Sequence, residues 1–298
     1  MKPFFTVIIT TYNRPDVLIE AIDSVLKQAY KFFELLIIND GSQVDYSEVE
    51  RYIEKDKRVR YFYKKNEERS VARNFGIEQS EGDYICFLDD DDIYYLNHLQ
   101  VFYDAIDQNI GKDYFYRVGI QKKLVDGSIL KDPLPTQDVI VEGKNEKGNF
   151  DVYTAMYSSG NICIPKPFLV ENTFDKNLTY GEDVDLWIRM NQQHPLKVIR
   201  SFTYEYKMHD SNSVSWSTKS AKAYLNTIHH WKKTYPFMDK KFIRKKISEL
   251  SIGIAGFSSK TNKKESLYYI FYAVFHDIKL IADRRMWGAL KKVVLNKK

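Results

Sequence analysis

Four consecutive aspartates, Asp89 to Asp92, are the residues of this sequence best suited to chemistry. They follow the apolar run 84–88, which predicts a buried strand. Adjacent carboxylates repel one another unless a cation lies nearby, and their hard oxygen atoms are ligands that Mg²⁺ and Mn²⁺ prefer. The segment therefore predicts a divalent-metal site completed by waters or a substrate's phosphates. The alternative is a solvated acidic cap on a helix starting near Tyr94, because carboxylates favour helix N-termini.

Two more polar clusters follow predicted strands in the same way. Residues 11–13 (Thr-Tyr-Asn) come after the apolar run 5–10, and residues 40–42 (Asp-Gly-Ser) come after the run 34–39. Ligands of parallel sheets bind at the carboxyl ends of the strands. We therefore expect the three clusters to converge on one crevice.

The elements that would position these clusters alternate along the first hundred residues. Strands are predicted over 5–10, 34–39, 59–64 and 84–88, and helices over 15–28, 46–55 and 70–79. Continuous apolar strands separated by helices indicate a mostly parallel sheet with helices on both faces, which is an α/β fold.

The middle of the chain is less regular. A strand over 114–125 and another from 129 flank the hairpin turn Asp126-Gly127. Residues 131–147 are rich in Pro, Gly and charge, which predicts a mobile loop. Further strands are expected over 158–164 and 202–208, with a helix over 182–191 between them.

From about residue 217 the pattern is helical only. Apolar stripes at helical spacing run from Ile243 through Phe257 and from Ile278 through Val293. Residues 217–298 hold 19 Lys and Arg against 5 Asp and Glu, a net charge of +14, whereas residues 1–216 carry −9. The charge has two interpretations, solubility or contact with an anionic membrane, and the aromatic run 268–272 favours the membrane.

The composition and the lengths of the apolar runs indicate the cellular compartment of the protein. The 298 residues are 44% hydrophobic and include two cysteines, Cys86 and Cys163, without metal-ligand spacing, which indicates a reducing compartment. No signal peptide is evident, and no apolar run reaches the roughly 18–20 residues of a membrane span. We expect a cytoplasmic protein, peripheral at the inner face of the cell membrane.

Five motifs occur in order along residues 3–216. They are residues 6–13 (TVIITTYN), 38–42 (INDGS), 72–76 (ARNFG), 87–92 (FLDDDD) and 181–186 (GEDVDL). Together they resemble the motifs of family 2 inverting glycosyltransferases. The resemblance implies a GT-A fold over residues 1–216, with a nucleotide-binding half (1–110) and an acceptor-binding half (111–216). Residues 217–298, a basic helical C-terminal region, lie outside it.

The resemblance also assigns the donor site. It implies that Asp40 accepts the imide N–H of a pyrimidine, framed by Thr10 and Tyr12, and that Arg73 contacts the nucleotide. Taken alone, Asp40 could be an Asx-turn residue that satisfies its own backbone, and Arg73 a surface helix arginine.

Metal binding and proton transfer are assigned to carboxylates. By resemblance Asp91 coordinates Mn²⁺ or Mg²⁺ at the donor diphosphate, Asp89 contacts the ribose or the metal, and His209 approaches the metal or the diphosphate. Asp90 occupies a position where a small residue is commoner in this family, so it stays open which of the four aspartates binds the metal and which contacts the nucleotide. Asp183 is the candidate general base, which an inverting transfer requires, with Glu182 and Asp185 as competitors.

The sequence thus predicts a metal-dependent inverting glycosyltransferase. The expected donor is a nucleotide-sugar, most simply UDP-linked, and the expected acceptor is a glycan or lipid-pyrophosphate-linked sugar of bacterial surface polysaccharide synthesis. A sugar nucleotidyltransferase is the enzymatic alternative, although residues 10–16 lack the glycine-rich loop that cradles a triphosphate. The second alternative, which is not an enzyme, is a catalytically silent scaffold that keeps the GT-A fold. The basic region shows no nucleic-acid-binding module.

Overall fold

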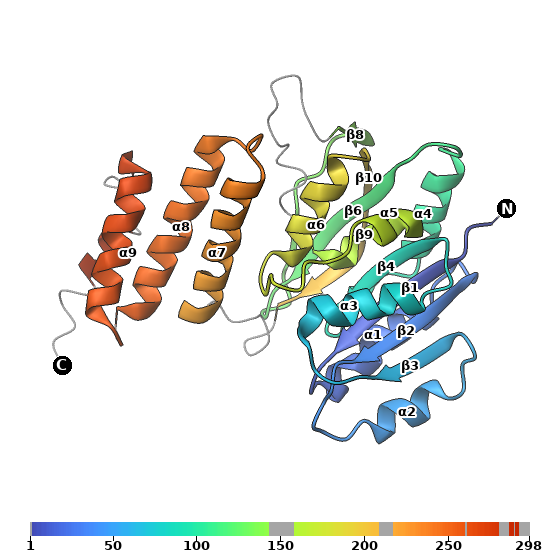
Figure 1. The fold of residues 1–298 in the computed structure, drawn as a ribbon. Helices are drawn as coiled ribbons and strands as arrows, with labels where there is room; N and C mark the ends of the chain where they lie inside the picture. Colours follow the sequence, from blue (N-terminus) through green and yellow to red (C-terminus); the bar gives the residue numbers. More distant parts are fainter. Residues whose placement is uncertain are drawn as a thin grey trace. The chain divides into compact units, whose positions relative to one another are not determined.

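The computed structural model describes residues 2–142, 158–208, 217–259, 261–279, 286–288 and 290–291 (Figure 1). The chain forms two compact units. The first, the α/β unit, comprises Met1–Gly143, Asp151–Asn177 and Glu182–Asp210. The second, the helical unit, comprises Lys144–Phe150, Leu178–Gly181 and Ser211–Lys298.

Four parallel strands form one part of the sheet of the α/β unit. In the order β3-β2-β1-β4 these are Val59–Tyr63, Phe33–Asn39, Phe5–Thr11 and Tyr84–Asp89. All seven residues of β2 are buried, because helices cover both faces as the continuous apolar run predicted. Thr10 of β1 pairs with Ile38 of β2 and with Asp89 of β4, so the polar clusters after these strands reach the same edge.

Three helices cover this part of the sheet. Helices α1 (Pro15–Leu26) and α2 (Ser47–Ile53) pack on one face, and α3 (Glu68–Gln79) packs on the other (Figure 1). Gly76 brings α3 close, since a Cβ there would lie 2.7 Å from Ile8 Cγ2. The predicted strand–helix alternation is confirmed.

The other part of the sheet is mixed. β4 pairs antiparallel with β9 (Ile162–Pro165), β9 pairs antiparallel with β6 (Phe115–Lys123), and β6 runs parallel to β10 (Leu196–Lys207). Around these strands lie β5 (Ile93–Tyr94), β7 (Ile129–Lys131), β8 (Val139–Val141), the 3-10 turn η2 (Ser159–Asn161) and the helices α4 (His98–Asp107), α5 (Lys166–Glu171) and α6 (Glu182–Asn191). The hairpin at Gly127, whose φ is +81°, and the helix over 182–191 are confirmed.

Three local expectations were wrong. No helix starts near Tyr94, which instead belongs to β5 and pairs with Tyr204, and α4 begins at His98. Residues 139–141 of the predicted loop form β8, because they pair with the early part of β10. The strand expected over 202–208 begins at Leu196, so its first half escaped detection.

The helical unit consists of α7 (Thr218–Thr234), α8 (Lys240–Ser258) and α9 (Lys263–His276), with α8 between the other two (Figure 1). Ile243, Ile247, Leu250 and Ile254 of α8 are buried as the first stripe predicted, but Phe257 is 41% exposed. Ile278, the start of the second stripe, is 72% exposed, and much of that stripe lies outside the described residues. Among the described helices, none is long and apolar enough to cross a membrane.

Candidate active site

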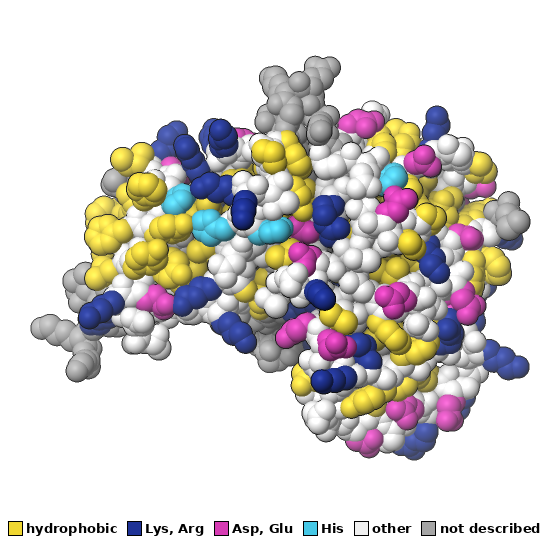
Figure 2. All heavy atoms as spheres, viewed as in Figure 1, with side chains coloured by type: hydrophobic (Ala, Val, Ile, Leu, Met, Phe, Trp, Pro, Cys, Tyr) yellow, Lys and Arg dark blue, Asp and Glu magenta, His cyan; other side chains and the backbone are white. Residues whose placement is uncertain are grey.

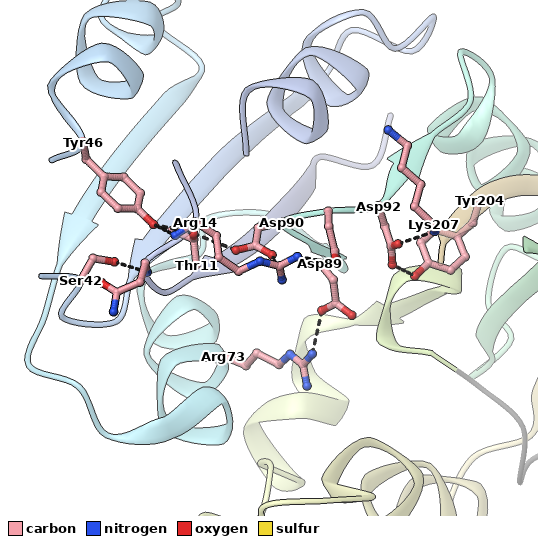
Figure 3. Close-up of polar contacts among 12 residues, drawn as sticks. Thr11, Arg14, Ser42, Tyr46, Arg73, Asp89, Asp90, Asp92, Tyr204 and Lys207 are labelled. Carbon is pink, nitrogen blue, oxygen red and sulfur yellow. Dashed lines mark hydrogen bonds and ion pairs between the residues drawn. The ribbon is translucent and has the colours of Figure 1, made fainter. Parts of the chain in front are cut away.

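The four aspartates, the first of which ends β4, do not share one partner: Figure 3 shows Asp89 bound to Arg73, Asp90 bound to Arg14 and Asp92 bound to Tyr204. Asp90 accepts hydrogen bonds from Thr11 Oγ1 at 2.8 Å and from Arg14 Nη1 at 2.7 Å. The same guanidinium reaches Asp91 Oδ2 from Nη2 at 2.5 Å. Arg14 therefore neutralises two neighbouring carboxylates, which explains how adjacent aspartates are tolerated here.

Two of the aspartates lie in the interior. Asp90 is 4% exposed and Asp92 is fully buried, so the solvated acidic cap is wrong. Asp92 accepts hydrogen bonds from the Tyr204 hydroxyl and, at 2.9 Å, from the Lys207 backbone N–H. Burial raises the pKa of Asp90 to about 7, against the opposing effect of Arg14, and raises the pKa of Asp92 well above its usual range.

Arg73 joins the aspartates to the motif that contains Asp183. From α3, its Nη2 donates to Asp89 Oδ1 at 2.9 Å and its Nη1 donates to Glu182 Oε1 at 3.0 Å. Burial alone would lower the pKa of Arg73, but Asp89, Glu182 and Asp183 outweigh it and raise that pKa. Arg73 is 5% exposed, so it is not a surface helix arginine.

The three carboxylates at the start of α6 have different surroundings. Glu182 is held by Arg73, and Asp185 is held by Arg189 at 2.9 Å. Asp183 accepts a hydrogen bond from the Val184 backbone N–H at 2.7 Å. Burial and then the neighbouring charge of Glu182 raise the pKa of Asp183 to about 7, although Arg73 opposes this. Asp183 therefore combines a pKa of about 7 with a carboxylate that neither of those two arginines binds, which suits a general base.

Asp40 is turned away from its own backbone. Its Oδ1 accepts from Lys64 Nζ at 2.7 Å and from the Glu67 backbone N–H at 3.2 Å. The side chain that bonds the backbone of this turn is that of Asn39, whose Oδ1 accepts the Ser42 N–H, three residues on, at 2.9 Å. The Asx-turn alternative for Asp40 is therefore wrong.

The turn after β2 leaves no room for a side chain at its centre. Gly41 has a φ of +77°, and a Cβ there would lie 2.5 Å from the Asn66 backbone nitrogen. Glycine is needed on both counts, and the tight turn brings Asp40 against the end of β3.

The remaining predicted residues of the donor site lie at the end of β1. Thr10 is partly buried beside Asp89, and Tyr12 is 45% exposed. An exposed aromatic ring next to Asp40's edge of the sheet can stack on a base. His209 lies outside the described residues.

Several residues of this site were not predicted. Three of them bind carboxylates, namely Arg14, Lys64 and Tyr204. The fourth, Tyr46, holds the loop after β1, because its hydroxyl oxygen accepts the Arg14 backbone N–H at 3.0 Å (Figure 3). Arg14 could have been noticed, because it follows the Thr-Tyr-Asn cluster at the end of a predicted strand. The partner of Tyr204 is 112 residues away in the chain, so no local signal marks that pair.

The arrangement of these carboxylates shows what kind of divalent-metal site they could form. Among the described residues, no group of three or more His, Cys, Asp or Glu side chains could hold a metal ion. Mg²⁺ often binds through one or two carboxylates together with waters and substrate phosphates, and such a site needs no larger cluster. The side chains of Asp89 and Asp91 are 35% and 14% exposed, against 6% for Asp90, so this pair fits that kind of site.

Comparison with solved structures identifies the fold. The chain superposes on residues 1–349 of TarS from S. aureus with a TM-score of 0.63 at 17% identity, covering 98% of this chain and 88% of that one. The same protein in complex with UDP-GlcNAc gives a TM-score of 0.61. The expected GT-A fold is confirmed.

Sequence comparison identifies relatives over the same region. An uncharacterized glycosyltransferase of Rickettsia bellii is 35% identical over 196 residues, which are 64% of this chain and 27% of the relative. A Campylobacter jejuni protein named GalNAc(5)-diNAcBac-PP-undecaprenol beta-1,3-glucosyltransferase is 26% identical over 230 residues, 76% of this chain and 72% of the relative. The chain spans less than a third of the length of the R. bellii and Rickettsia felis relatives.

The family model described as glycosyl transferase family 2 matches residues 6–123. This match contains β1 to β4 and the aspartates that follow, which are the elements that build the site described above. Over these residues the chain is similar to glycosyltransferase family 2.

Proposed function

We propose that this chain transfers a sugar from a UDP-linked donor to a glycan or lipid-pyrophosphate-linked acceptor, with inversion at the anomeric carbon and with a divalent metal. The observation that carries the proposal is the placement of Arg73. Its guanidinium binds Asp89, one of the two candidate metal ligands, and Glu182, next to the candidate base Asp183. In the proposed mechanism, Arg73 would hold the diphosphate-binding and proton-accepting parts of the site in a fixed relation to each other.

The nucleotide would bind at the edge formed by β1 and β2. Asp40 would accept the imide N–H of the pyrimidine, Tyr12 would stack on the base, and Thr10 would frame the ribose. Lys64 and the Glu67 N–H already hold the Asp40 carboxylate in place. A carboxylate fixed before the ligand arrives loses little freedom on binding, which favours affinity.

The metal would be held by Asp91 with Asp89, and His209 stays a predicted ligand. A divalent cation bound there neutralises the negative charge that develops on the leaving diphosphate. Arg14 binds both Asp90 and Asp91, but Asp90 is also bound by Thr11 Oγ1 and its side chain is only 6% exposed, so we assign Asp90 to positioning the loop instead.

Asp183 would accept the proton of the acceptor hydroxyl. As that oxygen forms its bond to the anomeric carbon, the bond from the carbon to the leaving oxygen breaks, and UDP departs with the electron pair. A carboxylate with a pKa of about 7 is a stronger base than an ordinary aspartate and is still half ionised at neutral pH.

The proposed acceptor and the proposed pathway are supported by the names of similar proteins. The C. jejuni relative is named for an undecaprenol-linked acceptor, and TarS has been solved with UDP and UDP-GlcNAc. These names support a UDP-sugar donor and a lipid-linked glycan acceptor of a surface polysaccharide. We further propose the boundaries 1–110, 111–216 and 217–298 for the nucleotide-binding half, the acceptor-binding half and the helical region, in a cytoplasmic protein at the membrane.

A nucleotide-sugar panel tests the proposal. The purified chain is assayed with UDP-, TDP-, CDP- and GDP-linked sugars and Mn²⁺ for thermal shift and nucleotide release. We expect a UDP-linked sugar to raise the melting temperature, because a ligand that binds the folded state stabilises it. Asp91→Ala should lose the metal-dependent part of this shift, and Asp107→Ala, an exposed aspartate of α4, is the matched control. A shift with GDP-sugars only, or an Asp91→Ala variant that transfers sugar at the wild-type rate without metal, would refute it.

A further inference from the structure

Helix α9 is apolar on two opposite faces. Its inner face, with Ser266, Ile270 and Ala273, is buried. Its outer face carries Tyr268, Phe271 and Phe275, and Ile278 follows just after the helix end. These four side chains, the outer row, are 59%, 72%, 84% and 72% exposed.

The orientation of α9 is fixed by its inner face. Ser248 Oγ of α8 donates to the Ala273 carbonyl at 3.0 Å, and Ser266 Oγ donates to the Ala255 carbonyl at 2.6 Å. Lys222 of α7 pairs with Glu265 in the first turn of α9. Because small side chains bring α8 and α9 together and hydrogen bonds tie them, α9 cannot rotate to bury the outer row.

The outer row is a continuous surface rather than scattered side chains. The spacing of three and four residues places Tyr268, Phe271 and Phe275 one above the next along one face of α9, and Ile278 follows two residues after the helix end. Figure 2 shows hydrophobic side chains gathered over α9, with Lys and Arg around them. Exposed apolar patches with a polar rim mark interaction sites.

The charge around the row identifies the partner's chemistry. Lys264 lies seven residues before Phe271 on the same face, Lys279 follows Ile278, and both are exposed. Residues 217–298 carry 19 Lys and Arg against 5 Asp and Glu. A second copy of this chain would bring the same positive charge to the contact and be repelled, whereas an anionic lipid surface is complementary to it.

We propose that the outer row of α9 docks on an anionic phospholipid bilayer. The rings enter the boundary between headgroups and acyl chains, and Lys264 and Lys279 contact the headgroup phosphates. The helix lies on the membrane, consistent with the lack of a spanning helix among the described ones. This rests on the membrane location proposed above and adds the surface that makes the contact; it does not depend on glycosyl transfer.

Co-sedimentation of the full chain with vesicles tests the proposal. We compare phosphatidylglycerol–phosphatidylcholine vesicles with phosphatidylcholine alone, at low and high salt. Phe271→Ser/Phe275→Ser should weaken binding to anionic vesicles at least about tenfold, because the variant lacks the two rings that the bilayer would bury. Ile110→Ser/Val125→Ser is the matched control, since those residues are 77% and 61% exposed on the α/β unit. Lys264→Glu should weaken binding, and high salt should weaken that of the wild type.

Two further measurements on the same samples separate loss of membrane binding from loss of donor binding and from self-association. A donor-induced thermal shift kept by the phenylalanine variant shows that donor binding is intact, so failure of membrane docking and failure of the proposed activity are distinguishable. Sedimentation equilibrium detects self-association. The proposal is overturned if the wild type ignores anionic vesicles, if the control variant loses as much binding, or if the phenylalanines hold a dimer together.

Discussion

The two units of this protein use charge in opposite ways. In the α/β unit, the Arg73 side chain is 6% exposed and binds Asp89 and Glu182 at 2.9 and 3.0 Å. In the helical unit, Lys245 is 68% exposed and lies 4.0 Å from Glu249. A buried charge is fixed by its partner because leaving it unpaired is costly, whereas an exposed pair adds little to stability.

This difference matches what each unit is proposed to do. A transferase site must hold a metal ligand and a base in fixed geometry before the substrate arrives, and buried ion pairs supply that rigidity. A docking surface must leave its side chains free to meet a partner. Substitutions in the candidate active site should therefore damage chemistry, and substitutions in the outer row should damage only association.

The largest effect is expected from removal of the proposed base. Asp183→Asn should lower turnover by about 10²–10⁴-fold, because it removes the proton acceptor but keeps the size of the side chain. Nucleotide release during transfer measures turnover, and the UDP-sugar thermal shift should persist. Asp107→Asn is the control. Turnover within a few-fold of wild type would assign the base elsewhere, with Glu182 the first candidate.

Removal of the bridging cation should come next. Arg73→Met removes the cation bonded to the buried Glu182, leaves only Arg69 at 3.9 Å among the described cations, and should lower the free energy of unfolding by about 3–5 kcal/mol. Urea denaturation measures this. Arg51→Met, on the exposed side of α2, should change it by no more than about 0.5 kcal/mol. Equal stability of the two variants would mean that the buried pairs of the α/β unit are no stronger than surface pairs.

The raised pKa of Asp183 predicts a pH dependence. The base must be ionised to accept a proton, so the rate should fall about tenfold per pH unit below about pH 7 and level off above it. Asp90 has a similar raised pKa, so the profile must be compared with that of Asp183→Asn, in which the acid limb should vanish. A wild-type rate that stays flat down to pH 5 would contradict the prediction.

The smallest effect is expected on the outer row. Phe271→Ala should change the free energy of unfolding by no more than about 0.5 kcal/mol, because the ring is exposed. The neighbouring Ile270→Ala should cost about 2–5 kcal/mol, because Ile270 is 5% exposed and packs in the core of the helical unit. Thermal or urea unfolding of the pair measures the contrast. Equal losses would show that both faces of α9 are buried.

Several features of this protein could be read from the sequence. The order β1 to β4 with α1, α2 and α3 follows from apolar runs and helical periodicity, which are local signals. The polar residues after these strands could be placed at one edge because parallel strands end together. Asp40, Arg73, Asp89, Asp91 and Asp183 were chosen by motif, and the structure brings Arg73 into contact with Asp89 and with Glu182.

Only the tertiary structure decided which groups neutralise the carboxylates. Arg73 and Glu182 are 109 residues apart, and Arg14 is 76 residues from Asp90, so their pairing depends on how the sheet is assembled. The strand β8 and the exposed face of α9 were settled in the same way. A periodic pattern fixes which residues share a face of an element, but only the packing of elements fixes which face, and which charge, meets a partner.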